Sequence, residues 1–142
     1  MTAQRPRILL VEDNARDVRL MQIVLSELDD FPHLLETAND LVSGVARVRA
    51  GGVDLVLLDL NLPESQGVAT LARFVREAPA VPVIVVTTLA DRELAAEAVA
   101  KGAQDYLVKG RMHGPLLPHV LRGGMERHRL TAELRALRSP KA

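Results

Sequence analysis

Five polar side chains that could bind a metal ion or a phosphoryl group stand at the ends of short apolar runs. They are Glu12 and Asp13 after residues 8–11, Asp59 after 55–58, Thr87 after 83–86 and Lys109 after 105–108. Clustered carboxylates repel, so a cation must compensate them or one must take up a proton. Hard oxygen ligands suit Mg²⁺ or Mn²⁺. A carboxylate beside such an ion can attack phosphorus and form an acyl phosphate, while an ammonium and a hydroxyl contact the phosphoryl oxygens.

Each of these residues has a simpler explanation when it is considered alone. Asp13 could be the N-cap of the following helix, Thr87 is a good β-former, and Lys109 could extend its ammonium to solvent. Asp59 is harder to explain in this way, because an acid directly after four aliphatic residues is costly to bury without partners. The simple explanations require coincidental polar choices at every strand end, so a shared site is favoured.

The elements that must position these residues are indicated by the apolar pattern. The runs at 8–11, 55–58 and 83–86 fit strands buried on both faces of a parallel sheet, and 33–37 and 105–108 are weaker candidates. Amphipathic helical periods lie between the runs. The alternation predicts an α/β, flavodoxin-like, doubly wound fold with five helices and a five-stranded parallel sheet of order 2-1-3-4-5. Ligands bind such sheets at the carboxyl ends of the strands, where the polar residues should converge.

A last helix is predicted over about residues 115–137. Three leucines in it have heptad-like spacing, although one heptad is too short to establish a coiled coil: Leu130, Leu134 and Leu137. Gly123 and Gly124 interrupt this helix at a cost of about 1 kcal/mol each relative to alanine. The pair is either tolerated within an amphipathic helix or marks a hinge or a close backbone contact before an interaction segment.

Composition limits the class of protein. The chain of 142 residues supports one domain, with an ordinary balance of 48% hydrophobic and 25% charged residues. The formal net charge of 0 argues against direct nucleic-acid binding, although residues from 111 onward carry seven basic groups against two acids. There are no cysteines, no signal-peptide stretch, and no apolar run near the roughly 20 residues that span a bilayer. A cytoplasmic protein without membrane contact is expected.

Four segments carry a resemblance to a known family when they are taken in order. They are residues 8–14, residues 54–63 followed by Gly67, residues 82–87 and residues 101–109. In this order they resemble the receiver domain of two-component response regulators, the CheY-like domains. The resemblance covers about residues 7 to 128. The ordered set is specific, whereas any one motif alone is weak.

The resemblance implies a phosphoacceptor site. Asp59 matches the residue that takes a phosphoryl group from a phosphohistidine. Glu12 and Asp13 match the acid pair that holds Mg²⁺ (or Mn²⁺), with Asp13 the more direct ligand, and Asn61 matches the position whose backbone carbonyl completes the metal shell. Such a domain is a switch that assists its own phosphorylation and dephosphorylation, and it is not expected to be an enzyme acting on other substrates.

The resemblance also implies a conformational switch. Thr87 and Lys109 match the hydroxyl and the lysine that contact the phosphoryl group. Tyr106 matches the aromatic residue that turns inward when the threonine moves. Two positions next to the site depart from the family pattern: Gly110 stands where a proline, often after a cis peptide, is usual, and Thr88 stands where a small residue is usual.

Partners are expected on two surfaces. On the first helix, Leu20 and Ile23 lie off the predicted buried stripe, and we hypothesise that they contact a histidine kinase or a histidine phosphotransfer protein. Residues 1–128 are expected to form the receiver domain. Residues 129–142 are expected to extend the last helix as a linker or a dimerisation segment, or to be a frayed terminus.

Other functions fit the residues less well. A phosphohydrolase of the haloacid dehalogenase type also uses a strand-end aspartate, but it needs a second acid two residues later, where Asn61 stands. A flavodoxin would need a hydroxyl- and glycine-rich loop after the first strand, where the chain has Glu12, Asp13 and Asn14. A phosphate-independent protein-binding module stays open as the alternative to the phosphoacceptor switch.

Overall fold

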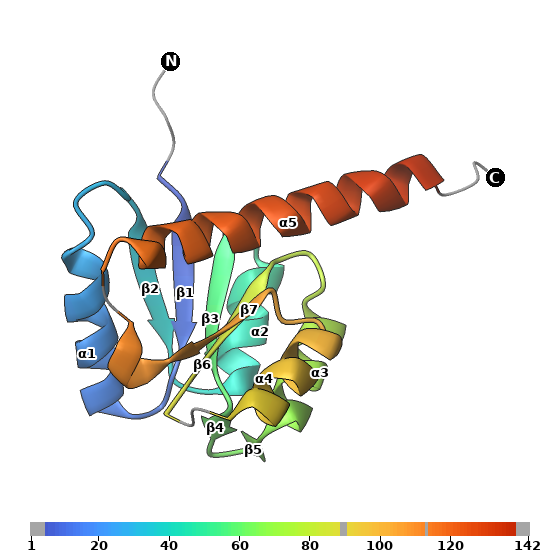
Figure 1. The fold of residues 1–142 in the computed structure, drawn as a ribbon. Helices are drawn as coiled ribbons and strands as arrows, with labels where there is room; N and C mark the ends of the chain where they lie inside the picture. The colour runs from blue at the N-terminus through green and yellow to red at the C-terminus, as the bar shows by residue number, and fades with distance from the viewer. Residues whose placement is uncertain (1–4, 89–90, 113, 139–142) are drawn as a thin grey trace.

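Five parallel strands alternate with five helices in the computed structural model, which describes residues 5–88, 91–112 and 114–138 (Figure 1). The sheet strands are β1 (Arg7–Val11), β2 (Leu34–Ala38), β3 (Leu55–Asp59), β6 (Val83–Thr87) and β7 (Asp105–Val108). The helices are α1 (Ala15–Ser26), α2 (Leu41–Arg49), α3 (Val68–Glu77), α4 (Arg92–Ala100) and α5 (Leu116–Arg138). A two-residue hairpin of β4 (Asn61–Leu62) and β5 (Ser65–Gln66) and a 3₁₀ turn at Lys109–Arg111 complete the described elements.

The strand order is β2-β1-β3-β6-β7, and every pairing in this sheet is parallel. β6 and β7 are the fourth and fifth predicted strands, so the predicted order and the flavodoxin-like fold class are confirmed. None of the described helices has the length and apolar character needed to cross a membrane.

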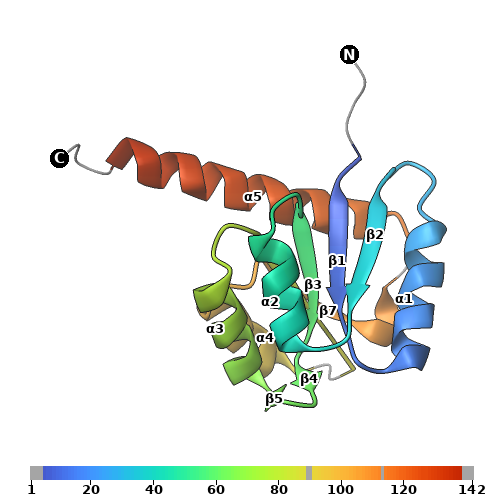
Figure 2. The ribbon, with the colours of Figure 1, turned by 180° about the vertical axis from the view of Figure 1, so that it is seen from behind.

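Helices cover both faces of the sheet, with α1 and α5 on one face and α2, α3 and α4 on the other (Figures 1 and 2). Alternate residues of β1 serve the two resulting cores. Leu9 and Val11 pack in a cluster with the buried residues of α2 and α3, and Ile8 and Leu10 pack with those of α1 and α5. This double burial explains why the central strands have continuous apolar sequences.

The first helix begins one residue later than the simple capping explanation for Asp13 suggested. Asn14 is the N-cap, and its side chain accepts hydrogen bonds from the backbone N–H groups of Arg16 and Asp17 at 2.9 and 3.1 Å. Asp13 is therefore not used in capping the helix. Asp91 is the N-cap of α4, and its side chain accepts hydrogen bonds from the backbone N–H groups of Glu93 and Leu94.

The last helix continues without a break through Gly123 and Gly124. Gly124 is buried, and a Cβ atom at this position would lie 3.0 Å from Cδ1 of Ile84 and 3.4 Å from Cβ of Gln104. Gly124 therefore allows close packing of α5 on the sheet, while a Cβ at Gly123 would meet only the side chain of Arg127. Of the two explanations left open by the sequence, close backbone contact applies to Gly124.

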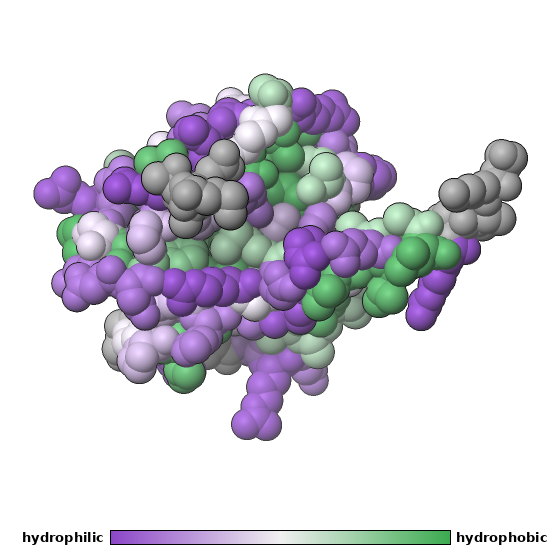
Figure 3. Space-filling model, turned by 90° about the horizontal axis from the view of Figure 1, so that it is seen from above, coloured by the Kyte–Doolittle hydropathy of each residue, from purple (hydrophilic) through white to green (hydrophobic). Residues whose placement is uncertain are grey.

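The end of α5 projects past the edge of the sheet (Figures 1 and 2). Three leucines on the projecting part are exposed: Leu130, Leu134 and Leu137. Apolar surface gathers along this part of the helix when the molecule is viewed from above (Figure 3). One helix thus joins a buried half with a half that is open to solvent.

Glu36 on the edge strand β2 lies between two arginines. Nε of Arg47 donates to Oε1 at 2.7 Å, and Nη1 of Arg7 donates to Oε2 at 2.5 Å. These hydrogen bonds, first from Arg47 and then from Arg7, lower the pKa of Glu36 from 4.5 to about 2. Because the folded-state pKa lies below the unfolded one, the stability from these pairs is present above about pH 4.5 and is lost as the pH falls toward 2.

Replacing Glu36 with glutamine is therefore expected to lower the free energy of unfolding by about 1 kcal/mol at pH 7, since solvent screens these partly exposed pairs. The difference between the two chains should shrink as the pH is lowered from about 4.5 toward 3. Urea unfolding of both chains over this range measures it. A difference that does not change with pH would show that the ion pairs are not its cause.

Candidate functional site

The register of the sheet brings the predicted site residues to one edge. Val11 pairs with Leu58, so the residues that follow β1 lie beside Asp59 at the end of β3. Asp59 pairs with Val86 of β6, and Thr87 pairs with Val108 of β7, directly before Lys109. The carboxyl ends of four neighbouring strands therefore present the acids, the hydroxyl and the lysine together.

Three carboxylates meet at this edge. Glu12 is 1% exposed and Asp59 is 5% exposed, whereas Asp13 is open to solvent. One oxygen of each carboxylate lies within 4.8 Å of the others. The backbone N–H of Asn61 donates to Oδ1 of Asp59 at 3.2 Å, which fixes the orientation of the aspartate. Buried acids at such separations require a compensating positive charge or the uptake of a proton by one of them.

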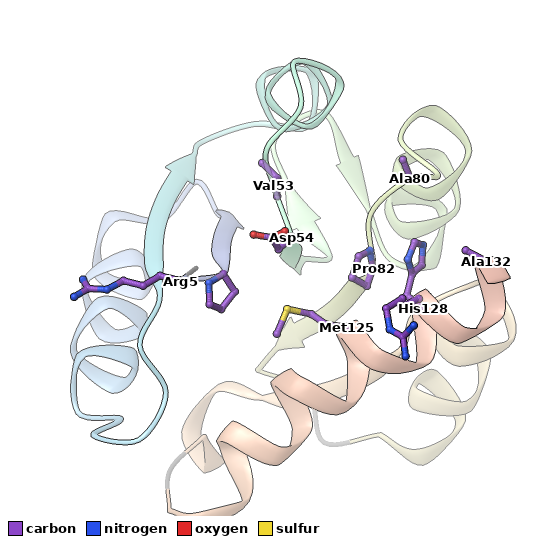
Figure 4. Close-up of a pocket in the computed structure, with 10 residues that line it drawn as sticks. Arg5, Val53, Asp54, Ala80, Pro82, Met125, His128 and Ala132 are labelled. Carbon is purple, nitrogen blue, oxygen red and sulfur yellow. The ribbon is translucent and has the colours of Figure 1, made fainter. Parts of the chain in front are cut away.

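A cavity of about 240 Å³ opens above the acids. It is lined by Glu12, Asp13, Asn14, Asp17, Asp59, Asn61, Thr88 and Lys109. Thr88, the residue that departs from the family pattern, therefore borders the cavity with its exposed side chain. A larger cavity of about 500 Å³ lies at the opposite end of the sheet, where Pro6, Asp54 and Pro82 precede their strands and Met125 of α5 closes one side (Figure 4). Glu12, Asp13 and Asp59 do not line that larger cavity.

Lys109 supplies the positive charge inside the acidic cluster. The residue is 7% exposed, and its Nζ donates to Oε1 of Glu12 at 2.5 Å and to Oδ2 of Asp17 at 2.9 Å. Oδ2 of Asp59 lies 3.6 Å from Nζ. Burial lowers the pKa of Lys109, but the hydrogen bonds to Glu12 and Asp17 outweigh it, so the net shift is upward and the lysine stays charged.

Asp17 is the site residue that sequence reasoning missed. It lies in the first turn of α1, and its side chain is about a quarter exposed, at 28%. The available signal was its place in the first turn of the helix that follows Glu12 and Asp13, close to the strand end where the other polar residues were predicted to converge. A polar residue on the first turn after a catalytic strand end is, however, also expected from the helix dipole alone.

The electrostatic balance of the site favours a further cation. Burial, and then the neighbouring carboxylate of Asp59, raise the pKa of Glu12 to about 7, while Lys109 acts in the opposite direction. The Lys109 ammonium pairs with Glu12, Asp17 and Asp59, and Asp13 adds a further carboxylate beside Glu12 and Asp59, so one ammonium does not neutralise the group. The donor set is made of carboxylate oxygens, which fits a hard divalent ion.

Thr87 and Tyr106 lie in contact next to the acids. Thr87 is buried at the end of β6, and Tyr106 of the neighbouring strand β7 is partly buried. Burial raises the pKa of the Tyr106 phenol, and a hydrogen bond with the Thr87 side chain acts in the opposite direction. The threonine and the aromatic ring singled out in the sequence are thus brought together.

The backbone after Lys109 has no unusual peptide. All peptide bonds of the described residues are trans, including the one between Lys109 and Gly110, and the chain forms a 3₁₀ turn there. A Cβ atom at Gly110 would have no heavy atom beyond its chain neighbours within 4 Å, so no contact requires glycine at this position.

Comparisons with known proteins identify the family of the chain. Residues 8–120 match the family model of the response regulator receiver domain. The transcriptional regulatory protein ZraR of Escherichia coli K12 is 34% identical over 109 residues, which are 77% of this chain and 24% of ZraR. This chain therefore spans about a quarter of the length of that curated relative.

Solved structures show the same architecture. The signal receiver domain of an HD domain-containing protein from Pseudomonas fluorescens Pf-5 superposes with a TM-score of 0.76 at 30% identity, over 94% of this chain and 96% of that one. The phosphorylated cyanobacterial phytochrome response regulator RcpA superposes with a TM-score of 0.63 at 26% identity, over 97% and 98% of the two chains. The ordered motifs, the sheet with acids and lysine at its carboxyl edge, and these matches lead to one assignment: the chain belongs to the receiver domain family of two-component response regulators.

Proposed function

We propose that the receiver works as a phosphoacceptor switch, in which Asp59 takes a phosphoryl group from a phosphohistidine. The observation that carries this proposal is the buried Asp59 carboxylate at the edge of an open cavity, with the Lys109 ammonium 3.6 Å away. A carboxylate oxygen of Asp59 attacks phosphorus, the bond to the histidine nitrogen breaks, and an acyl phosphate forms. RcpA, a relative of the same fold, was solved in a phosphorylated state, which supports the proposal.

The residues of the cluster fit a divalent metal ion. Glu12, Asp13 and Asp59 would hold Mg²⁺ (or Mn²⁺), together with the backbone carbonyl of Asn61, because their carboxylate oxygens lie close together and carry excess negative charge. When bound, the ion supplies positive charge that offsets the charge on the phosphoryl oxygens.

Backbone and side-chain groups of this chain have separate roles in the transfer. The Asn61 N–H orients the nucleophilic Asp59, and the buried Lys109 ammonium stabilises the transferred phosphoryl oxygens. The exposed Asp13 and the open cavity leave a path for the donor. With these groups the receiver assists both its own phosphorylation and the later hydrolysis of the acyl phosphate, without acting on other substrates.

Thr87 and Tyr106 would transmit the change. In the structure, Tyr106 shares a hydrogen bond with Thr87. On phosphorylation the Thr87 hydroxyl shifts toward the phosphoryl oxygens, and Tyr106 follows it inward. Phosphorylation thereby changes the relative stability of two packings of the surface formed by α4, β7 and α5.

The direct test is the intact mass of the protein after incubation with acetyl phosphate, with and without Mg²⁺. A single phosphoryl adduct that requires Mg²⁺ is the expected result. The absence of any adduct would overturn the phosphoacceptor switch and leave a phosphate-independent protein-binding receiver as the function.

The partner is a cytoplasmic histidine kinase or histidine phosphotransfer protein that contacts α1. Leu20 and Ile23 are 41% and 48% exposed, off the buried face of α1 formed by Met21 and Leu25. An apolar helix face of this kind fits a partner helix.

Replacing Leu20 with alanine is expected to slow phosphotransfer from the cognate partner by about tenfold, because an apolar anchor of an interface contributes about 1–2 kcal/mol. Phosphorylation by acetyl phosphate should be unchanged, since the site at the sheet edge is intact. The two rates, measured with the same protein preparation, check the prediction. Equal slowing in both assays would exclude a docking role.

Residues 129–138, the described part of the predicted segment 129–142, serve as an extension of the receiver, and a second copy of the chain pairs with them. Residues 139–142 lie outside the described part of the chain. The exposed Leu130, Leu134 and Leu137 form one face of the projecting helix, which matches the self-complementary surface of a two-stranded pairing.

Sedimentation equilibrium tests this pairing. Leu134→Glu is expected to shift the protein toward monomer, because a charge replaces an apolar contact. Ala136→Glu adds the same charge to an exposed position on a different face of the helix and should leave association unchanged. Equal association of all three chains would contradict a dimer through this helix.

A further inference from the structure

One carboxylate partner of the Lys109 ammonium, Asp17, has no role in the phosphoacceptor scheme. Nζ lies 2.9 Å from Oδ2 of Asp17 in α1 and 3.6 Å from Oδ2 of Asp59 in β3. The lysine thus forms a hydrogen bond with Asp17 and only an ion pair at longer range with the nucleophile. Glu12, at 2.5 Å, anchors the ammonium between the two.

This arrangement has a consequence for any phosphoryl group on Asp59. The transferred group adds anionic oxygens beyond the Asp59 carboxylate, and the same ammonium must contact them. An ammonium has three N–H donors. Glu12 and Asp17 already accept hydrogen bonds from two of them, which leaves one for Asp59 and the phosphoryl oxygens. Asp17 also lines the cavity in which the phosphoryl group would lie, so its negative charge faces the incoming anion.

We propose that Asp17 is a positioning residue that draws the Lys109 ammonium toward α1 and competes with the phosphoryl group for it. This inference rests on the proposed phosphorylation of Asp59. On phosphorylation the Asp17–Lys109 hydrogen bond is weakened and a hydrogen bond from Lys109 to a phosphoryl oxygen forms, and no covalent bond outside the transfer itself changes. Asp17 therefore slows the forward reaction relative to a site without this carboxylate.

The size of the effect follows from the exposure of Asp17. Its side chain is 28% exposed, so solvent screens the pair and the interaction is of the strength found for partly exposed ion pairs. Removing it should speed phosphorylation by about three- to fivefold. The two buried acids are untouched by this change, so the adduct should still form on Asp59.

The experiment compares Asp17→Asn with the unchanged protein, using acetyl phosphate at saturating Mg²⁺ and intact mass as a function of time. Asparagine keeps the shape of the side chain and removes its charge. Glu27→Gln is the matched control, because it removes one charge from the exposed opposite end of the same helix. Asp17→Glu retains a carboxylate and should react more slowly than Asp17→Asn.

A second readout reports on the lysine itself. The ¹⁵N and ¹H resonances of the Lys109 ammonium should shift in Asp17→Asn and stay in place in Glu27→Gln, which a merely structural role of Asp17 would not produce. An unshifted resonance, or a rate equal to or below that of the unchanged protein, would overturn the inference while the phosphoacceptor function stands. If neither chain forms an adduct, the phosphoacceptor function fails and this competition fails with it.

Discussion

Replacing Asp59 with asparagine is expected to abolish the phosphoryl adduct that acetyl phosphate forms in the presence of Mg²⁺. The carboxamide is a poor nucleophile, and it removes a carboxylate ligand from the acidic cluster that lines the cavity. Intact mass spectrometry of the two chains after the same incubation measures the loss, which should be complete within detection.

The matched control is Asp54→Asn. Asp54 lies at the opposite end of β3, directly before the strand, where its carboxylate accepts a hydrogen bond from the Arg7 backbone N–H at 2.8 Å. This substitution makes the same chemical change near the same strand, yet it should leave the adduct in place. An adduct that persists in Asp59→Asn would assign the nucleophile to another acid.

Replacing Gly124 with leucine is expected to lower the free energy of unfolding by about 3 kcal/mol, the upper end of the range for an overpacked core. Even a single Cβ atom there would lie 3.0 Å from Cδ1 of Ile84, and a leucine side chain has no space between α5 and the sheet. Because β6 carries Ile84 and ends at Thr87, the strain falls on the strand that leads into the site. Urea unfolding checks the loss.

Gly123→Leu provides the comparison for this prediction. The position is one residue away, and a Cβ there would meet only the flexible end of the Arg127 side chain. Leucine is a better helix former than glycine, so this change should raise the free energy of unfolding by about 0.8 kcal/mol. If both substitutions change the free energy of unfolding in the same direction, the close contact at Gly124 does not decide the stability of the helix.

Much of the fold could be predicted because its central strands carry unambiguous patterns. All five residues of β3 and of β6 are buried, so their sequences are continuous apolar runs that end abruptly in Asp59 and Thr87. The edge strands β2 and β7 are only partly buried, and their sequences gave correspondingly weaker signals. The site followed from the fold, since parallel strands bring their carboxyl ends to one edge.

Other features could not be predicted for physical reasons. The hairpin of β4 and β5 has strands of two residues, which is too short for any periodicity, and it depends on tertiary contacts such as the hydrogen bond from Thr70 Oγ1 to Ser65 Oγ at 2.8 Å. Val99 belongs to an apolar helical spacing, yet it is 52% exposed, because the short α4 buries only a narrow face around Ala98. The hydrogen bond between Asp17 and Lys109 joins residues 92 positions apart, and spacing along the chain carries no information about it.

The unbroken course of α5 makes it a mechanical lever. Its first part is held on the domain by the buried Leu117, Leu121 and Gly124 and by hydrogen bonds from Arg127 to Gln104 O and from His128 to Pro79 O. The part after His128 is exposed as far as Arg138. At the rise of an α-helix the exposed part beyond His128 is about 15 Å long, so a tilt of about 10° at its base displaces its end by about 2–3 Å. Small adjustments in the packing of β6 and β7 therefore produce larger displacements at the end of α5 than at its contacts with the sheet.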